Sequence, residues 1–108
     1  MTGKCQNLKF GFTAAATSAD TECSSDGERY AQMLTDCKLG FELGYDCAWV
    51  LEHHFTDYFP TPSPIVVMSH LAAAFPGLSL GSCVLVLPWY NPLRLAEEIS
   101  MLSHFCKG

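Results

Sequence analysis

The sequence predicts an α/β protein built on a parallel sheet, and three observations lead to this fold class. Strand-like and helix-like segments alternate along the 108 residues in the order β-α-β-α-β-α. The strand-like segments recur at intervals of about 30 to 40 residues, which is the period of βαβ units. Two of them are continuous apolar runs, the pattern typical of parallel strands that are covered on both faces.

The first strand is expected at residues 8–13, which are rich in aromatic and β-branched side chains, and residues 14–25 are expected to form a loop. A helix follows, because Ser25 and Glu28 have the three-residue spacing of a capping box. Gly44 suits the left-handed turn that ends such a helix. The residues at helical spacing that predict its buried face are Tyr30, Met33, Leu34, Cys37 and Phe41.

The second strand is expected at residues 47–51, with Trp49 in the core, and residues 56–64 contain three prolines and predict a loop. Ser63 and Pro64 have the residue types of an N-cap and a first helical position, so a second helix is expected from there to about Phe75.

The third strand is expected at residues 78–87, ended by Pro88, and contains Gly81, which indicates a bulge or the close approach of a ligand or backbone. Asn91 and Pro92 then predict the start of a last helix. The residues expected on its buried face are Leu95, Ile99 and Leu102.

Composition and charge narrow the function classes. The chain is 49% hydrophobic and has a net charge of -5 without a basic cluster, so nucleic acid is not an expected partner. No apolar run approaches the roughly 20 residues of a membrane span, and the start lacks the apolar core of a signal peptide, so we expect a cytoplasmic protein without a membrane partner. The six cysteines contain no C-x-x-C pair and are expected to be reduced and mostly structural, with a disulfide framework as the alternative.

Three parallel strands would leave two sheet edges without a partner, one of them long and apolar. A flavodoxin-like sheet uses about five strands and a TIM barrel uses eight in about 250 residues. We therefore expect further strands on the C-terminal side. A three-stranded fold that stands alone, or one completed by oligomerisation, is the alternative.

Ligands of parallel α/β folds bind at the carboxyl ends of strands, where this sequence places Glu52, His53 and His54. Histidine can act as an acid or base near neutral pH, so catalytic and structural roles both stay open for this pair. Neighbouring side chains on an extended strand point to opposite faces, which argues against a shared metal ion. Glu52 is interpreted either as a group that orients a histidine or binds a ligand, or as a solvated charge.

The segment 44–55 (GYDCAWVLEHHF) resembles the second-strand motif of the bacterial luciferase-like, flavin-dependent monooxygenases. The segments 62–64 (PSP), 80–88 (LGSCVLVLP) and 91–98 (NPLRLAEE) continue the resemblance in the same order. It covers the chain from about residue 8 to 108, and several ordered motifs make it specific.

The resemblance implies a partial TIM barrel, with residues 1–108 as the first three βα units and the N-terminal portion of a luciferase-like monooxygenase domain. It also implies oxidoreductase chemistry, in which reduced FMN and O2 act on a small organic substrate and a separate flavin reductase supplies the reduced flavin. The 108-residue chain alone is expected to be inactive. Its proline-rich loop at 56–64 is closer to the non-luminescent branch, so light emission is not expected.

By the same resemblance His53 matches the catalytic histidine, a proton-transfer group near the flavin. The stretch Ser82, Cys83 and Val84 matches third-strand backbone that meets the isoalloxazine ring. In luciferases this stretch contains a cis peptide between small residues, whereas Cys83 and Val84 are larger. Glu52 is also expected to contact the cofactor. The residues expected on the substrate side are His54, Phe55 and Tyr58.

Other interpretations stay open beside this one. The deazaflavin F420 replaces FMN in some relatives, so an F420-dependent oxidoreductase is one alternative. A non-catalytic fragment or interaction protein that keeps the motif is another. A homo-oligomer is a further expectation, and no metal is expected in the site.

Overall fold

The computed structural model describes residues 8–17 and 25–106, and three strands in these ranges form one parallel sheet. The strands are β1 (Gly11–Ala14), β2 (Cys47–Val50) and β3 (Ser79–Ser82), and they lie in the order β1-β2-β3. The parallel pairing confirms the predicted fold class.

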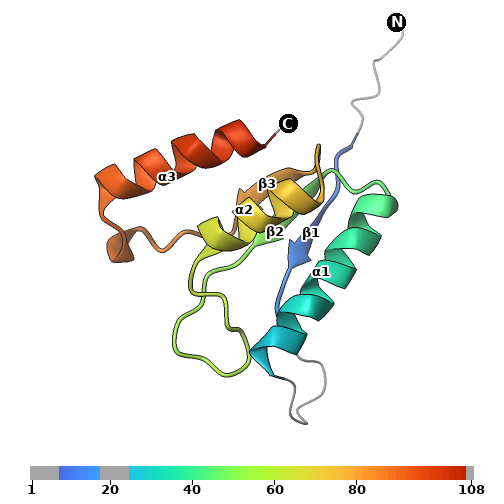
Figure 1. Ribbon diagram of the computed structural model, residues 1–108, viewed down its shortest axis with the longest axis horizontal. Coiled ribbons are helices and arrows are strands. Elements are labelled where there is room, and N and C mark those ends of the chain that lie inside the picture. The colour runs from blue at the N-terminus through green and yellow to red at the C-terminus, as the bar shows by residue number, and fades with distance from the viewer. Residues whose placement is uncertain (1–7, 18–24, 107–108) are drawn as a thin grey trace, which may run out of the picture.

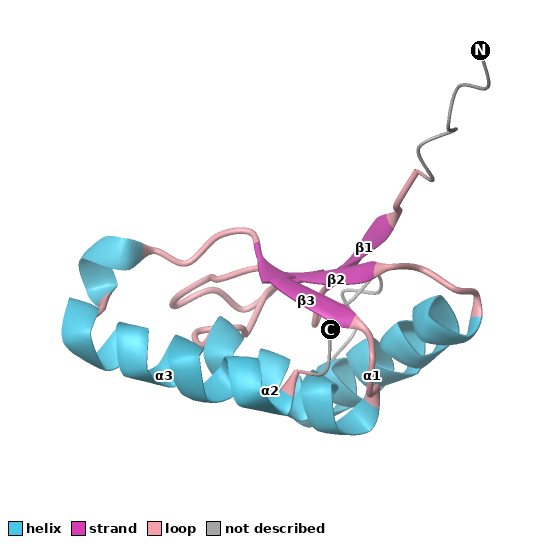
Figure 2. Ribbon diagram, turned by 90° about the horizontal axis from the view of Figure 1, so that it is seen from above, coloured by secondary structure: helices cyan, strands magenta, loops and turns pink. Residues whose placement is uncertain are grey.

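Three helices connect and follow the strands: α1 (Asp26–Glu42), α2 (Pro64–Ala74) and α3 (Pro92–Phe105). All three lie on one face of the sheet (Figures 1 and 2), and the opposite face carries no helix among the described residues. A doubly wound sheet has helices on both faces, whereas a βα barrel has them only outside. The sequential strand order and one-sided helices therefore match three consecutive units of a partial βα barrel.

The start of α1 follows the predicted capping box. Ser25 accepts a hydrogen bond from the backbone N–H of Glu28, and the Glu28 carboxylate accepts one from the backbone N–H of Ser25 at 2.7 Å. Gly44 has a φ of +81°, as expected for the turn after the helix. Phe41 was predicted to be buried but is 38% exposed, because its ring lies at the end of the helix layer, 5.7 Å from the ring of Phe75.

Both outer strands differ in extent from the sequence prediction. β1 begins at Gly11 rather than residue 8, because its partner β2 begins at Cys47 and the two residues are paired. β3 ends at Ser82 rather than residue 87, and the backbone N–H of Cys83 makes the last bond to β2, with the carbonyl of Val50. Pro88 lies inside a short 3₁₀ helix, Leu87–Trp89.

The two later helices begin where the sequence predicted. Pro64 is the first residue of α2, although the Ser63 side chain makes no capping bond. Asn91 caps α3 through its side-chain oxygen, which accepts from two backbone N–H groups. Ile99 was predicted to be buried but is 43% exposed, because it lies toward the solvent side of α3 while Leu95 and Leu102 are buried.

Trp49 is not a core residue, which corrects the sequence prediction. Alternate residues of β2 point to opposite faces, so Ala48 and Val50 are fully buried under the helices while Trp49 lies on the open face and is 44% exposed. Its indole lies over glycines of both neighbouring strands: a Cβ at Gly11 would be 2.6 Å from Trp49 Nε1, and a Cβ at Gly81 would be 2.5 Å from Cζ3. The group that approaches Gly81 is therefore a side chain.

The core lies between the sheet and the helix layer. It joins Val50 of β2 to Met33 and Cys37 of α1 and to Met68 and Leu71 of α2. In the described ranges, no helix has both the length and the apolar character needed to cross a membrane.

Candidate functional site

The carboxyl ends of β2 and β3 meet at one edge of the sheet, and the predicted site residues follow these two strands directly. Residues 52–55 leave β2 toward the long loop before α2, and residues 83–86 leave β3 toward the short 3₁₀ helix (Figure 1). The parallel register thus brings together two segments that are about 30 residues apart in the sequence.

Glu52 is the most enclosed polar group of this edge, with a side chain that is 0% exposed. Its carboxylate accepts hydrogen bonds from His54 Nε2 at 2.6 Å, from the backbone N–H of Val86 at 2.8 Å and from the hydroxyl of Tyr90 at 2.9 Å. Three donors compensate a buried carboxylate for the loss of water. Glu52 therefore ties the end of β2 to the segment that follows β3.

The protonation of Glu52 follows from these contacts. Burial acts to raise the pKa of the carboxyl, but the hydrogen bonds from His54, Val86 and Tyr90 outweigh it and lower the pKa below 4.5. Burial and the bond to Glu52 raise the pKa of Tyr90 to about 12. At neutral pH the pair is a carboxylate and a neutral phenol, so Tyr90 donates and Glu52 accepts.

His54 is held on two sides. Its Nε2 faces Glu52, and its ring stacks on Trp89 with centroids 4.3 Å apart and an angle of 18° between the planes. Because an ionised carboxylate can only accept, Nε2 carries the hydrogen of this bond. The orientation of the imidazole and the position of its proton are therefore both defined by neighbours.

His53 has different surroundings. Its ring packs against Phe59 at 4.8 Å and lies 6.1 Å from the ring of Tyr58, and its backbone N–H donates to the carbonyl of Thr61. The two histidines thus contact different segments, as their adjacent positions on an extended chain predicted. Among the described residues, no three side chains of His, Cys, Asp or Glu come together as metal ligands.

The two histidines and the loop before α2 line a cavity of about 380 Å³. Phe55 belongs to its wall and has a φ of +55°, an uncommon conformation for a residue other than glycine. Its ring is 96% exposed, and Tyr58 is also exposed. Of the three residues predicted on the substrate side, His54 and Phe55 therefore line this cavity and Tyr58 does not.

The stretch after β3 contains a cis peptide bond, between Cys83 and Val84. Cys83 is exposed, and Val84 is 61% exposed. Ser82, the last residue of β3, pairs with Val50.

Two residues of this edge were not singled out as site residues by the sequence. Trp89 and Tyr90 reach back to His54 and Glu52 across 35 and 38 positions of the chain. Their only signal was an aromatic pair between a strand end and a helix start, which is equally typical of rim packing.

Comparison with known proteins agrees with this architecture. The family model described as "Luciferase-like monooxygenase" matches residues 9–108. The chain belongs to this family. It is 37% identical over 71 residues to the alkanal monooxygenase alpha chain of Photorhabdus luminescens, a match that covers 66% of this chain and 20% of the relative.

Other relatives show a similar extent of matching. The uncharacterized protein y4vJ of Sinorhizobium fredii is 39% identical over 70 residues, which is 65% of this chain and 20% of that protein. The uncharacterized protein y4wF of the same organism is 35% identical over 89 residues, or 82% of this chain and 26% of that protein. The matched part of this chain spans about a fifth to a quarter of these relatives of the luciferase-like family.

Proposed function

We propose that this chain forms part of the active site of an FMN-dependent monooxygenase that uses reduced flavin and O2 to oxidise a small organic substrate. The observation that carries the proposal is the position of His53 and His54 after β2 and of the exposed residues Cys83 and Val84 after β3, at the same edge of the sheet, in a chain of the luciferase-like family. Since related proteins are named alkanal monooxygenases, an aliphatic aldehyde is the first substrate to test.

The residues of this edge fit the ring of a flavin better than its phosphate. Exposed Val84 offers an apolar contact to a planar heterocycle, and the neighbouring Cys83 is also exposed. Residues 52–55 and 82–86 contain no Lys or Arg, so these segments provide no cation for a phosphate. Ser82, Cys83 and Val84 are thus proposed to contact the isoalloxazine ring.

Reduced flavin, when bound, supplies the electrons that activate O2. The chain's own contribution is to hold and move a proton. His53 is the proposed catalytic residue, because its ring borders the cavity and is not bonded to the buried carboxylate. His54, Phe55 and Tyr58 are proposed to contact the substrate.

For Glu52 we propose a positioning role in addition to the predicted place near the cofactor. Its carboxylate is occupied by three protein donors, so it acts on a ligand through His54 and through the segment after β3. Four expectations stay predictions. They are a separate flavin reductase as partner, a homo-oligomeric state, a cytoplasmic location and the inactivity of the 108-residue chain alone.

The test uses the protein encoded by the gene that contains this chain, with O2 consumption measured in the presence of reduced FMN and an aliphatic aldehyde. We expect His53→Gln to lower turnover at least a hundredfold, the scale of general acid–base catalysis, while the flavin dissociation constant changes less than threefold. His104→Gln, on the exposed surface of α3 and in neither cavity, is the matched control and should keep full turnover.

Full turnover in the His53→Gln protein would refute the catalytic role of His53. The same assay with reduced F420 in place of FMN separates the two cofactors, because only the correct one supports turnover. Binding of neither cofactor would favour the non-catalytic interpretation.

A further inference from the structure

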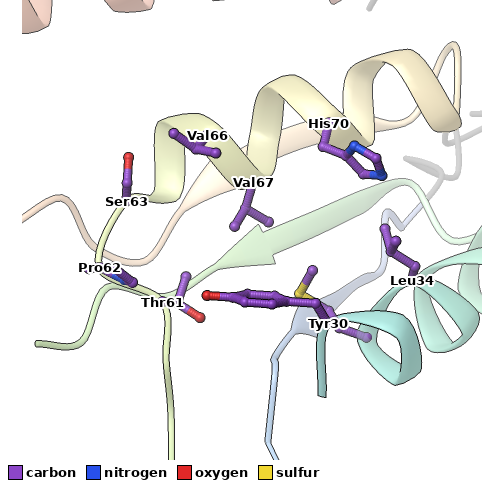
Figure 3. Close-up of a pocket in the computed structure, with 9 residues that line it drawn as sticks. Tyr30, Leu34, Thr61, Pro62, Ser63, Val66, Val67 and His70 are labelled. Carbon is purple, nitrogen blue, oxygen red and sulfur yellow. The ribbon is translucent and has the colours of Figure 1, made fainter. Parts of the chain in front are cut away.

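A second, larger cavity lies between α1 and α2 on the helix side of the sheet and has a volume of about 520 Å³. Figure 3 shows Tyr30 and Leu34 of α1 and Val67 and His70 of α2 around this space, with Thr61 at one end. Well-packed interiors contain few voids larger than a water molecule, whereas small-molecule sites measure about 300–1,000 Å³. The cavity is partly open to solvent, and its volume lies within the range of small-molecule sites.

The wall of this cavity is suited to a neutral, apolar molecule. Leu34, Val66 and Val67 contribute hydrocarbon surface, and none of the nine described residues that line the cavity is Asp, Glu, Lys or Arg. The hydroxyl of Tyr30 already donates to the backbone carbonyl of Pro60. A charged ligand would lose its hydration here, and the one basic side chain among these described lining residues is His70, at the exposed side of the cavity.

Thr61 provides one polar group in this wall. The residue is 1% exposed, and its hydroxyl oxygen has no hydrogen-bond partner among the described residues. Leaving a buried hydroxyl unpaired costs about 1–3 kcal/mol, so such groups are uncommon and call for an explanation. Because this oxygen is buried in the wall that Thr61 contributes to the cavity, its pairing with a ligand would require a rotation about the Cα–Cβ bond.

The cavity is separate from the edge where the flavin chemistry is proposed. Tyr30 and Pro62 line both cavities and form the wall between them, while His53 and His54 line only the smaller one. Binding in the larger cavity therefore does not depend on the proposed oxidoreductase function.

We propose that the cavity between α1 and α2 binds a neutral, mainly apolar small molecule that carries one hydroxyl or carbonyl group, which pairs with the Thr61 hydroxyl. Shape and apolar contact provide the affinity, and the single hydrogen bond selects the polar end of the ligand. His70, at the exposed side of the cavity, and Val66, which is 68% exposed, mark the entrance.

The experiment compares three probes of similar size on the 108-residue chain: 2-naphthol, naphthalene and 2-naphthoate. We expect 2-naphthol to shift the NMR signals of the Val66 and Val67 methyl groups saturably, and 2-naphthoate to bind at least tenfold more weakly. Thr61→Val removes the hydroxyl and keeps the shape of the side chain. It should weaken 2-naphthol about tenfold and change naphthalene affinity less than twofold.

Two further variants make the test specific. Thr35→Val is the same chemical change on the exposed side of α1, outside the cavity, and should leave both affinities unchanged. Val67→Phe fills the space and should abolish binding of all probes, with circular dichroism used to show that the fold is retained.

Three results would overturn the proposal. The first is an absence of saturable shifts at Val66 and Val67 with 2-naphthol. The second is an equal loss of 2-naphthol and naphthalene affinity in Thr61→Val. The third is a change of the Val66 and Val67 signals with protein concentration alone, which would show that a second copy of the chain covers the cavity.

Discussion

Removal of the charge on Glu52 should destabilise the chain and change how its stability depends on pH. The carboxylate is enclosed and accepts from His54, Val86 and Tyr90, and hydrogen bonds to a charged group contribute about 1.5–3 kcal/mol each in mutational series. These values do not add, because the three bonds share one acceptor and its burial costs free energy.

Glu52→Gln keeps the shape and one carbonyl acceptor, so we expect it to lower the free energy of unfolding by about 1–2 kcal/mol at pH 7. Glu52→Ala leaves all three donors without their acceptor and should cost about 3–5 kcal/mol, as for other broken buried pairs. For a domain whose free energy of unfolding is about 5–15 kcal/mol, Glu52→Ala would remove a large part of that free energy.

The pH dependence has a defined sign. The folded-state pKa of Glu52 lies below the ordinary value of 4.5, so folding favours the ionised form. The stabilisation is fully present above pH 4.5 and is lost as the pH falls through the lowered folded-state value. The difference in stability between wild type and Glu52→Gln should therefore shrink below pH 4.5.

Urea denaturation followed by circular dichroism, at several pH values from 7 down to 3, measures both effects. Glu97→Gln makes the same change on the exposed surface of α3 and should stay within about 0.5 kcal/mol of wild type. Equal stability and equal pH dependence of wild type and Glu52→Gln would refute the role assigned to the buried carboxylate.

Three further predictions concern the cap of α3, the open face and the thiols. Asn91→Ala should cost about 1 kcal/mol in urea denaturation because it removes the cap, while Asn91→Asp should cost much less; equal losses would contradict this. Gly81→Ala places a Cβ against the Trp49 indole and should cost about 1–3 kcal/mol, a loss that Trp49→Leu in the same chain should relieve. Burial raises the pKa of Cys37 to about 11, so mass spectrometry should find it unlabelled by a thiol reagent at pH 8 in the folded chain while exposed Cys83 is labelled.

Local signals predicted the elements of this fold better than their ends. The capping box at Ser25 and the Asn91–Pro92 pair act within a few residues, and both helices begin where these signals lie. The ends of β1 and β3 depend instead on where β2 begins and ends, which no local pattern of the outer strands records. The exposure of Trp49 has the same origin, because an apolar run cannot show whether both faces of its strand are covered.

In the candidate site too, local sequence predicted where residues lie but not which distant residues they contact. Position after a strand predicted that Glu52, His53 and His54 would lie at the carboxyl edge of the sheet, and the structure places them there. Their pairing could not be predicted, since the groups that hold Glu52 and His54 come from beyond β3. This pairing makes the two histidines chemically different: His54 has its Nε2 bound to a buried carboxylate, whereas His53 contacts aromatic rings. Substitution of His54 should therefore weaken the whole edge, whereas substitution of His53 should leave the fold intact and affect only the proton transfer that we propose for it.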